Sequence, residues 1–259
     1  MCETCGCMLH PRKQQPLLNT AKLVAPLAVS KHNHTLLHSI MSNNDKQASA
    51  NRERLKKHTI FCVNLMSSPG AGKTRLLEAT IGRMHKQLRI AVIEGDLETE
   101  NDAIRIRKQG VEAIQITTGS ACHLDAHYIE DALNKLDLAN LDLIFIENVG
   151  NLVCPAAFDL GQHKNIVLLS TTEGDDKPLK YPVMFRKVDG MIISKVELLA
   201  FFDDFSLARA TKNFQRLAND GDIWSLSAKT GLNMESWIHW LQTQVEAAQS
   251  THDAIIDLP

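Results

Sequence analysis

A phosphate-binding loop is the segment of the sequence whose chemistry is clearest. Residues 67–74 read Ser-Ser-Pro-Gly-Ala-Gly-Lys-Thr, which matches the pattern G-x-x-x-x-G-K-[ST] except that Ser67 replaces the first glycine. The glycines let backbone amides converge on phosphate oxygens at a helix N-terminus, whose dipole favours anions. Lys73 is predicted to reach the β- and γ-phosphates, and the Thr74 hydroxyl to bind Mg²⁺. The predicted nucleotide-binding residues here are Gly70, Ala71, Gly72, Lys73, Thr74 and Arg75.

Two acidic residues are candidates for binding Mg²⁺ or for positioning the attacking water. Asp96 and Glu147 each follow a predicted buried strand, and the carboxyl ends of parallel strands face the crevice in which ligands bind. With Lys73 they are the predicted catalytic residues, although Asp96 could instead cap the helix that follows it. Gly150, three residues after Glu147, could sense the γ-phosphate through its backbone amide.

Two later segments occupy the places where GTPases often carry Asn-Lys-x-Asp and Ser-Ala-Lys. The first reads Ser194-Lys195-Val196-Glu197, in which Lys195 can stack its stem on a base. Glu197 can accept both guanine N–H groups, although it is one methylene longer than aspartate, and Ser194 lacks the amide of asparagine. We therefore expect GTP as the nucleotide, with weaker base discrimination than usual. The second segment consists of Ser227, Ala228 and Lys229.

Three cysteines at the start of the chain could bind a thiophilic metal. Cys2, Cys5 and Cys7, hereafter the tail cysteines, place three thiols within six residues. Thiolates select soft or borderline ions such as Zn²⁺, Ni²⁺ or Cu⁺. Removal of Met1 would add the α-amine of Cys2 as a donor, and chelation through nitrogen and sulfur suits square-planar Ni²⁺. A tail stabilised by structural zinc is the alternative.

Cys122, His123 and Cys154, hereafter the triad, form a second possible metal site. Both segments are predicted to leave the carboxyl ends of strands and therefore to lie on the nucleotide face. Cys154 lies four residues after Gly150, so metal occupancy and γ-phosphate state could share one switch segment. A cysteine is also commonly a small buried hydrophobe, so the residues alone leave both readings open. Cys62, inside a predicted strand, is assigned to the core.

The elements that must position these groups alternate along residues 59–259, the predicted G domain. Apolar runs typical of buried strands are separated by amphipathic helical runs, which predicts a parallel-sheet, three-layer α/β/α P-loop fold. This arrangement also argues against a glycine-rich turn with an incidental lysine at the loop. Strands are predicted over residues 60–66, 89–94, 113–117, 141–146, 165–170, 190–194 and 222–226, and helices over 74–84, 100–109, 126–136, 206–218 and 234–248.

Two shorter regions precede the G domain. Residues 1–30 hold the tail cysteines and a proline-containing connector, and we expect a mobile metal-binding tail there. Residues 31–58 are predicted to be a short N-terminal helix. Its apolar patch at residues 36–41 is predicted to dock on the main domain, and a strongly polar run follows over residues 42–58.

Composition restricts the classes of partner. The 259 residues carry 28 Lys and Arg against 30 Asp and Glu, a formal net charge of −2, so neither nucleic acid nor an anionic membrane is expected as a partner. The aromatic share of 5% argues against a base-stacking surface. No stretch is long and apolar enough to cross a bilayer, and the early cysteines suit a metal site better than disulfides. We expect the protein in the cytoplasm, where thiols stay reduced.

Taken together, these segments resemble the hydrogenase nickel-incorporation GTPase family, HypB, over nearly the whole chain. The P-loop alone is generic, but its combination with the three cysteine-containing motifs is specific. The motifs that carry the resemblance are CETCGC at 2–7, SSPGAGKT at 67–74, EGDL at 94–97, CHLDA at 122–126, ENVGNLVCP at 147–155 and TEGDDKPLKYP at 172–182.

The resemblance implies a GTPase of the class that contains the signal-recognition and MinD-like nucleotide hydrolases, which dimerise with nucleotide. It implies a tight nickel site at the tail cysteines, and a weaker nickel or zinc site at the triad on the dimer interface. The implied role is delivery of Ni²⁺, with the companion chaperone HypA, to the large subunit of NiFe hydrogenase. Slow intrinsic hydrolysis is expected, because no arginine finger is evident beside the P-loop.

Other functions remain to be weighed. A urease nickel GTPase is disfavoured by the tail cysteines and by Cys122-His123. A metal sensor or storage protein could carry a purely structural nucleotide site, although scattered histidines in place of a histidine-rich tract do not support bulk storage. An ATP-driven partitioning ATPase is a further alternative, which competition between GTP and ATP would decide.

Overall fold

The computed structural model describes residues 31–96, 98, 100–119, 121–217 and 220–256. The predicted tail over residues 1–30, with the tail cysteines and their predicted metal site, lies outside these described residues. No helix in the described part of the chain combines the length and apolarity needed to cross a membrane.

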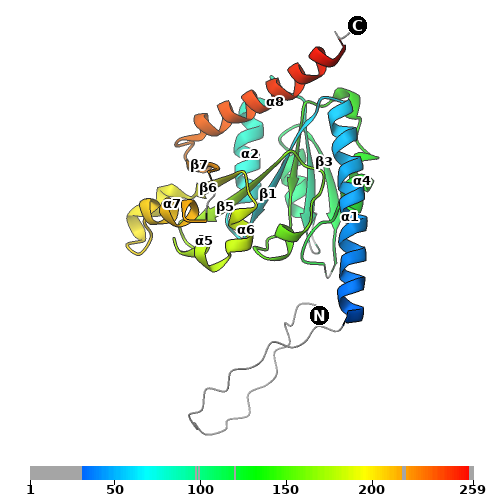
Figure 1. Cartoon of the computed structure of the whole chain (residues 1–259). Coiled ribbons are helices and arrows are strands. Elements are labelled where there is room, and N and C mark those ends of the chain that lie inside the picture. Colours follow the sequence, from blue (N-terminus) through cyan, green and yellow to red (C-terminus); the bar gives the residue numbers. More distant parts are fainter. Residues whose placement is uncertain (1–30, 97, 99, 120, 218–219, 257–259) are drawn as a thin grey trace.

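A parallel sheet of seven strands forms the centre of the fold, with helices on both faces (Figure 1). The strand order is β3-β2-β4-β1-β5-β6-β7, and each neighbouring pair is parallel. The predicted α/β/α P-loop architecture is confirmed. The strands are β1 (Phe61–Ser67), β2 (Ile90–Asp96), β3 (Glu112–Thr117), β4 (Leu143–Glu147), β5 (Lys164–Ser170), β6 (Gly190–Ser194) and β7 (Asp222–Ser225).

The helices follow the predicted order, and two short ones were not predicted. Element ends differ from the predicted ones by up to three residues, except that α8 runs eight residues further, to 256 instead of 248. The two unpredicted helices, α5 and α6, span only four and five residues, too few to show a helical period. The helices are α1 (Lys31–Lys57), α2 (Lys73–Met84), α3 (Asn101–Arg107), α4 (Ala126–Leu133), α5 (Lys177–Lys180), α6 (Pro182–Arg186), α7 (Leu207–Gln215) and α8 (Met234–Ile256), with 3-10 turns η1 (Leu138–Asn140), η2 (Cys154–Ala157) and η3 (Val196–Phe201).

Alternate side chains of β1 face the two helical layers. Phe61, Val63 and Leu65 pack with α2 and α8 on one side of the sheet. Cys62 points to the other side, where it packs among residues of α1 and α4. Cys62 is therefore a core residue, as predicted. Because both faces of the sheet are covered, the strand reads as a nearly continuous apolar run.

Helix α1 docks beside α4 through a stripe that is half polar. Asn44, Ala48, Asn51 and Leu55 are spaced three or four residues apart, and all four are buried. The docking stripe thus lies within the polar run of the sequence. Most side chains of the apolar patch predicted to dock, at residues 36–41, lie outside what the structure describes.

Helix α8 supports α2, the helix that the phosphate-binding loop leads into. The Trp237 side chain is completely buried between them, and its Nε1–H donates a hydrogen bond of 3.0 Å to the buried Thr80 hydroxyl of α2. The position of the α2 N-terminus therefore depends on the contact between these two helices.

Replacing Trp237 with phenylalanine is expected to lower the free energy of unfolding by about 1–3 kcal/mol, because the buried Thr80 oxygen loses its donor. Urea unfolding followed by circular dichroism measures this change. Trp240→Phe is the control, since Trp240 is only partly buried, and a smaller loss is expected there. Equal losses in the two variants would contradict the assignment to the Thr80 contact.

Candidate nucleotide and metal sites

The loop between β1 and α2 has the backbone shape that a phosphate cradle requires. Gly70 and Gly72 adopt φ values of +75° and +100°, left-handed conformations that favour glycine. The Lys73 ammonium donates a hydrogen bond of 3.1 Å to the Ser67 hydroxyl, so the serine at the unusual first position holds the lysine over the loop. The loop lines one side of a cavity of about 400 Å³.

The opposite side of this cavity is acidic. Glu94 of β2, Asp102 of α3 and Glu147 of β4 each bring a carboxylate oxygen within 4.8 Å of the others. The Thr74 hydroxyl donates a hydrogen bond of 2.9 Å to Oε1 of Glu147. Among the described residues, no hydrogen-bond partner reaches Oε2 of Glu94 or Oε2 of Glu147, although both atoms are buried. Oxygen donors of this kind suit Mg²⁺.

The charge of the acidic cluster favours a bound cation. Burial raises the pKa of Glu94, and the neighbouring Glu147 carboxylate raises it further. Burial also raises the pKa of Glu147, against the opposing effect of the Lys73 ammonium. Two buried carboxyl groups side by side therefore hold either a proton or a cation, and a hydrated divalent ion would relieve both their desolvation and their repulsion.

The predicted acidic residues occupy different places in this cavity. Glu147 belongs to the acidic cluster, whereas Asp96 lines the same cavity but is not in the cluster. Asp96 does not cap the next helix, because α3 begins at Asn101 after Glu100. Glu94 and Asp102 were missed by the sequence analysis. The one signal for Glu94 was its place two residues before Asp96 on the same strand.

Two arginines also line the cavity, and both are already paired. Arg105 makes ion pairs of 2.8 Å with Glu78 and with Asp102. Arg75, a predicted nucleotide-binding residue, lies 3.3 Å from the same Glu78 carboxylate. These contacts hold both guanidinium groups at the rim.

A second cavity, of about 300 Å³, adjoins the loop on the side of β6 and β7. Lys195, with φ of +60°, donates from its ammonium to the Gly70 carbonyl at 2.7 Å, and the Ser194 hydroxyl donates to the Ala71 carbonyl at 2.8 Å. Oε2 of Glu197 is buried without a partner among the described residues. The lining residues include Ala71, Gly72, Arg75, Ser194, Lys195, Glu197, Ala228 and Lys229.

Ser227 has a different place from its two neighbours. Its hydroxyl accepts a hydrogen bond of 3.1 Å from the Thr230 amide, which shapes the turn after β7. It is absent from the lining of the second cavity, so its contribution there is indirect, through the turn that presents Ala228 and Lys229.

The triad residues meet in the folded protein. The Cys122 and Cys154 sulfurs lie 2.8 Å apart, and the Cys122 sulfur lies 3.8 Å from Nδ1 of His123. All three side chains are half-buried. The His123 ring stacks on Phe158 at a centroid distance of 3.9 Å, and burial lowers its pKa, against the opposing effect of Asp125. Two thiols beside an imidazole form a donor set that suits Zn²⁺ or Ni²⁺.

A short segment joins the triad to the phosphate cavity. Gly150 lies against the loop so closely that a Cβ atom there would be 3.0 Å from the Pro69 Cα. Cys154 follows four residues later. In the segment that follows β3, the Leu124 amide, next to His123, donates a hydrogen bond of 3.3 Å to the Asn148 side chain. Asn148 in turn lines the phosphate cavity. The segment that carries Cys122 and His123 and the segment that carries Cys154 therefore both contact the wall of the nucleotide cavity within a few residues along the chain.

The chain is similar to known proteins over most of its length. Residues 61–223 match the family model described as CobW/HypB/UreG, nucleotide-binding domain. The chain is 48% identical over 205 residues to the hydrogenase maturation factor HypB of Azotobacter vinelandii, covering 79% of this chain and 67% of that protein. It is 42% identical over 249 residues to the hydrogenase/urease maturation factor HypB of Helicobacter pylori, covering 94% and 99%. A crystal structure of Helicobacter pylori HypB in complex with nickel superimposes with a TM-score of 0.75 at 44% identity, covering 79% of this chain and 96% of that one.

Proposed function

Since this chain belongs to the CobW/HypB/UreG family and, within it, to the HypB hydrogenase maturation factors, we propose that it hydrolyses GTP to control nickel delivery to the large subunit of NiFe hydrogenase. The observation that carries the proposal is the short connection between the two sites. Gly150 touches the phosphate-binding loop, and Cys154 joins Cys122 and His123 only four residues later. Loss of one phosphoryl group beside Gly150 can therefore move a metal ligand.

The phosphate cavity supports hydrolysis by a small set of residues. Lys73 stabilises negative charge on the β- and γ-phosphates, and the Gly150 amide reads the γ-phosphate. Thr74, Asp96 and the buried carboxylates of Glu94 and Glu147 hold Mg²⁺ or orient the attacking water. Mg²⁺, when bound, neutralises charge that develops on the phosphoryl oxygens. With Arg75 and Arg105 both paired to Glu78, we expect slow intrinsic turnover.

The second cavity supports guanine as the base. Lys195 stacks its stem on the ring, and the Glu197 carboxylate, whose buried Oε2 has no hydrogen-bond partner among the described residues, accepts the two guanine N–H groups. Adenine offers the carboxylate no such pair of donors. Recognition of guanine by Glu197 therefore distinguishes this protein from an ATP-driven partitioning ATPase.

Glu197→Gln is expected to weaken GTP binding about tenfold or more, because hydrogen bonds to a charged acceptor are lost, while ATP binding changes little. Displacement of a fluorescent GDP by GTP and by ATP measures both affinities. Glu235→Gln is a matched control, since the Glu235 side chain is 86% exposed. An unchanged ratio of GTP to ATP affinity would remove Glu197 from base recognition.

The triad is proposed as a nickel or zinc site whose affinity depends on the nucleotide, and the tail cysteines as a separate, tighter nickel site. Val153, beside Cys154, is 62% exposed, which suits a nucleotide- or metal-dependent homodimer at this face. A HypA-type chaperone and the hydrogenase large subunit are the proposed protein partners. We propose that the transfer of nickel between these proteins takes place in the cytoplasm.

Nucleotide exchange is expected to change nickel affinity at the triad by about 5–150-fold, the usual size of coupling between two sites. The measurement uses protein in which the tail cysteines are replaced by serine, titrated with Ni²⁺ in GDP–Mg²⁺ and in a non-hydrolysable GTP analogue with Mg²⁺. Linkage requires the reciprocal result, so Ni²⁺ must change the affinity ratio of the two nucleotides by the same factor. Equal nickel affinities in both nucleotides would remove the switch model.

A further inference from the structure

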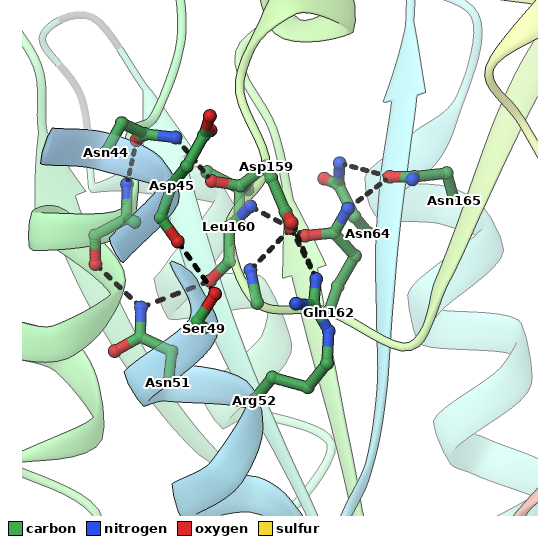
Figure 2. Close-up of polar contacts among 12 residues, drawn as sticks. Asn44, Asp45, Ser49, Asn51, Arg52, Asn64, Asp159, Leu160, Gln162 and Asn165 are labelled. Atoms are coloured by element: carbon green, nitrogen blue, oxygen red, sulfur yellow. Dashed lines mark hydrogen bonds and ion pairs between the residues drawn. The ribbon is translucent and has the colours of Figure 1, made fainter. Parts of the chain in front are cut away.

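Helix α1 holds both chain segments that carry the triad. One segment leads from Cys122 and His123 to Ala126, where α4 begins. The other leads from Cys154 through η2 to Asp159 and Leu160. Figure 2 shows side chains of α1 reaching the second segment through several hydrogen bonds. The two segments come from different strands, so their separation depends on what bridges them.

Two buried asparagines of α1 form these bridges. The Asn44 Oδ1 accepts from the Ala126 amide at 2.9 Å, and its Nδ2 donates to the Asp159 carbonyl at 2.8 Å. The Asn51 Nδ2 donates both to the Ala126 carbonyl at 2.7 Å and to the Leu160 carbonyl at 3.1 Å. The two side chains are only 3% and 2% exposed. Each carboxamide therefore links the His123 side of the triad to the Cys154 side.

The second segment is pressed closely against α1. Gly161 has φ of +90°, and a Cβ atom there would lie 2.5 Å from the Ala48 carbonyl oxygen. The Arg52 guanidinium makes two contacts of 2.7 Å with the Asp159 carboxylate. This segment therefore has little freedom to move away from α1 without breaking several contacts at once.

Docking of a helix does not by itself require buried amides. Ala48 and Leu55 in the same stripe are apolar, and an all-apolar stripe would avoid the cost of desolvating two carboxamides. Carboxamides have fixed donor and acceptor directions, so they define one arrangement of the two segments where apolar contacts would tolerate several. Their use at Asn44 and Asn51 is therefore best explained by a need for a defined spacing.

We propose that Asn44 and Asn51 are positioning residues of the triad, which set its metal affinity by fixing Cys122 and His123 relative to Cys154. The inference rests on the proposed function in one respect, namely that the triad binds nickel. The hydrogen bonds of the two asparagine side chains described above go to backbone groups of Ala126, Asp159 and Leu160. Each acts through Ala126 and through residues 159–160, a few positions along the chain from the ligands.

The test uses full-length protein in which the tail cysteines are serine, so that only the triad reports nickel. Asn44→Ala and Asn51→Ala are each expected to weaken Ni²⁺ binding about tenfold or more, as observed when groups that orient metal ligands are removed. Competition with a chromophoric chelator gives the affinity, and the thiolate-to-nickel charge-transfer absorption reports the ligand geometry. The absorption band should shift or weaken in both variants, which a purely structural role would not produce.

Asn43→Ala is the matched control. Asn43 is the neighbouring asparagine on the same helix, is exposed, and its side-chain amide lies within hydrogen-bond distance, 3.0 Å, of the His127 ring of α4. Its replacement should leave nickel affinity and the absorption band unchanged. Asn44→Asp separates the effects of the two Asn44 hydrogen bonds. It keeps the oxygen that accepts from the Ala126 amide and removes the N–H that donates to the Asp159 carbonyl. It should weaken nickel binding as Asn44→Ala does.

The outcomes separate the two levels of the proposal. The positioning role is overturned if the folded asparagine variants keep the nickel affinity and the absorption spectrum of the parent protein. This holds even if the melting temperature of the metal-free variants is lower. If an alanine variant does not fold, the nickel affinity of Asn44→Asp tests the positioning role, since that variant retains the hydrogen bond from the Ala126 amide. Failure of the parent protein to bind nickel, or no loss on Cys154→Ser, instead overturns the triad as a metal site.

Discussion

Lys73→Ala is expected to lower the rate of GTP hydrolysis by about 10²–10³-fold, the usual effect of removing one group that stabilises charge in a transition state. Lys73 is only 8% exposed, and its ammonium donates a hydrogen bond to the Ser67 hydroxyl in the loop. Alanine leaves the phosphate oxygens without this buried cation. Phosphate release at saturating GTP and Mg²⁺, and in single turnover, measures the loss.

Lys86→Ala provides the comparison for Lys73. Lys86 is exposed just beyond the end of α2, so its loss should leave hydrolysis unchanged. Hydrolysis that survives in Lys73→Ala would point to a contaminating enzyme or to a different nucleotide site. In a storage or sensor protein with a structural nucleotide site, nickel affinity would not respond to nucleotide in the parent protein or in Lys73→Ala.

Replacing Cys122 and Cys154 together by serine is expected to weaken nickel binding at the triad more than about 100-fold. Both soft donors of the triad are then replaced by hydroxyls, which are poor ligands for Ni²⁺ or Zn²⁺. The sulfurs lie 2.8 Å apart, so one ion can contact both. Titration of the protein without tail cysteines, with Ni²⁺ and separately with Zn²⁺, measures the loss for each metal.

The remaining thiol of the G domain serves as the control. Cys62 is fully buried, and burial raises the pKa of its thiol far above the usual range, so it stays protonated and is no ligand. Cys62→Ala should keep full metal affinity, with some loss of stability from the small cavity. Nickel affinity that falls equally in Cys62→Ala and in the double serine variant would mean that both act through destabilisation of the fold.

The sequence alone determined the features that depend on local pattern. Alternating strands and helices follow from hydrophobic period, and the phosphate-binding loop follows from glycines and a lysine in one short segment. The triad could be proposed from position in the chain, because both segments leave carboxyl ends of parallel strands. The helix ends shifted and α5 and α6 were missed, since a helix of one turn carries no periodic signal.

Contacts between distant segments were decided only by the tertiary structure. Glu94 and Glu147 become a buried pair because β2 and β4 are neighbours in a register that places these two residues side by side. That register is a property of the whole sheet, and neither strand specifies it alone. The amide bridges of α1 are a second case, because Asn44 and Asn51 lie in a polar run whose composition suggests a solvent-exposed helix. Buried amides become recognisable only when the carbonyl and N–H groups that satisfy them, 75 to 115 residues away along the chain, are in place.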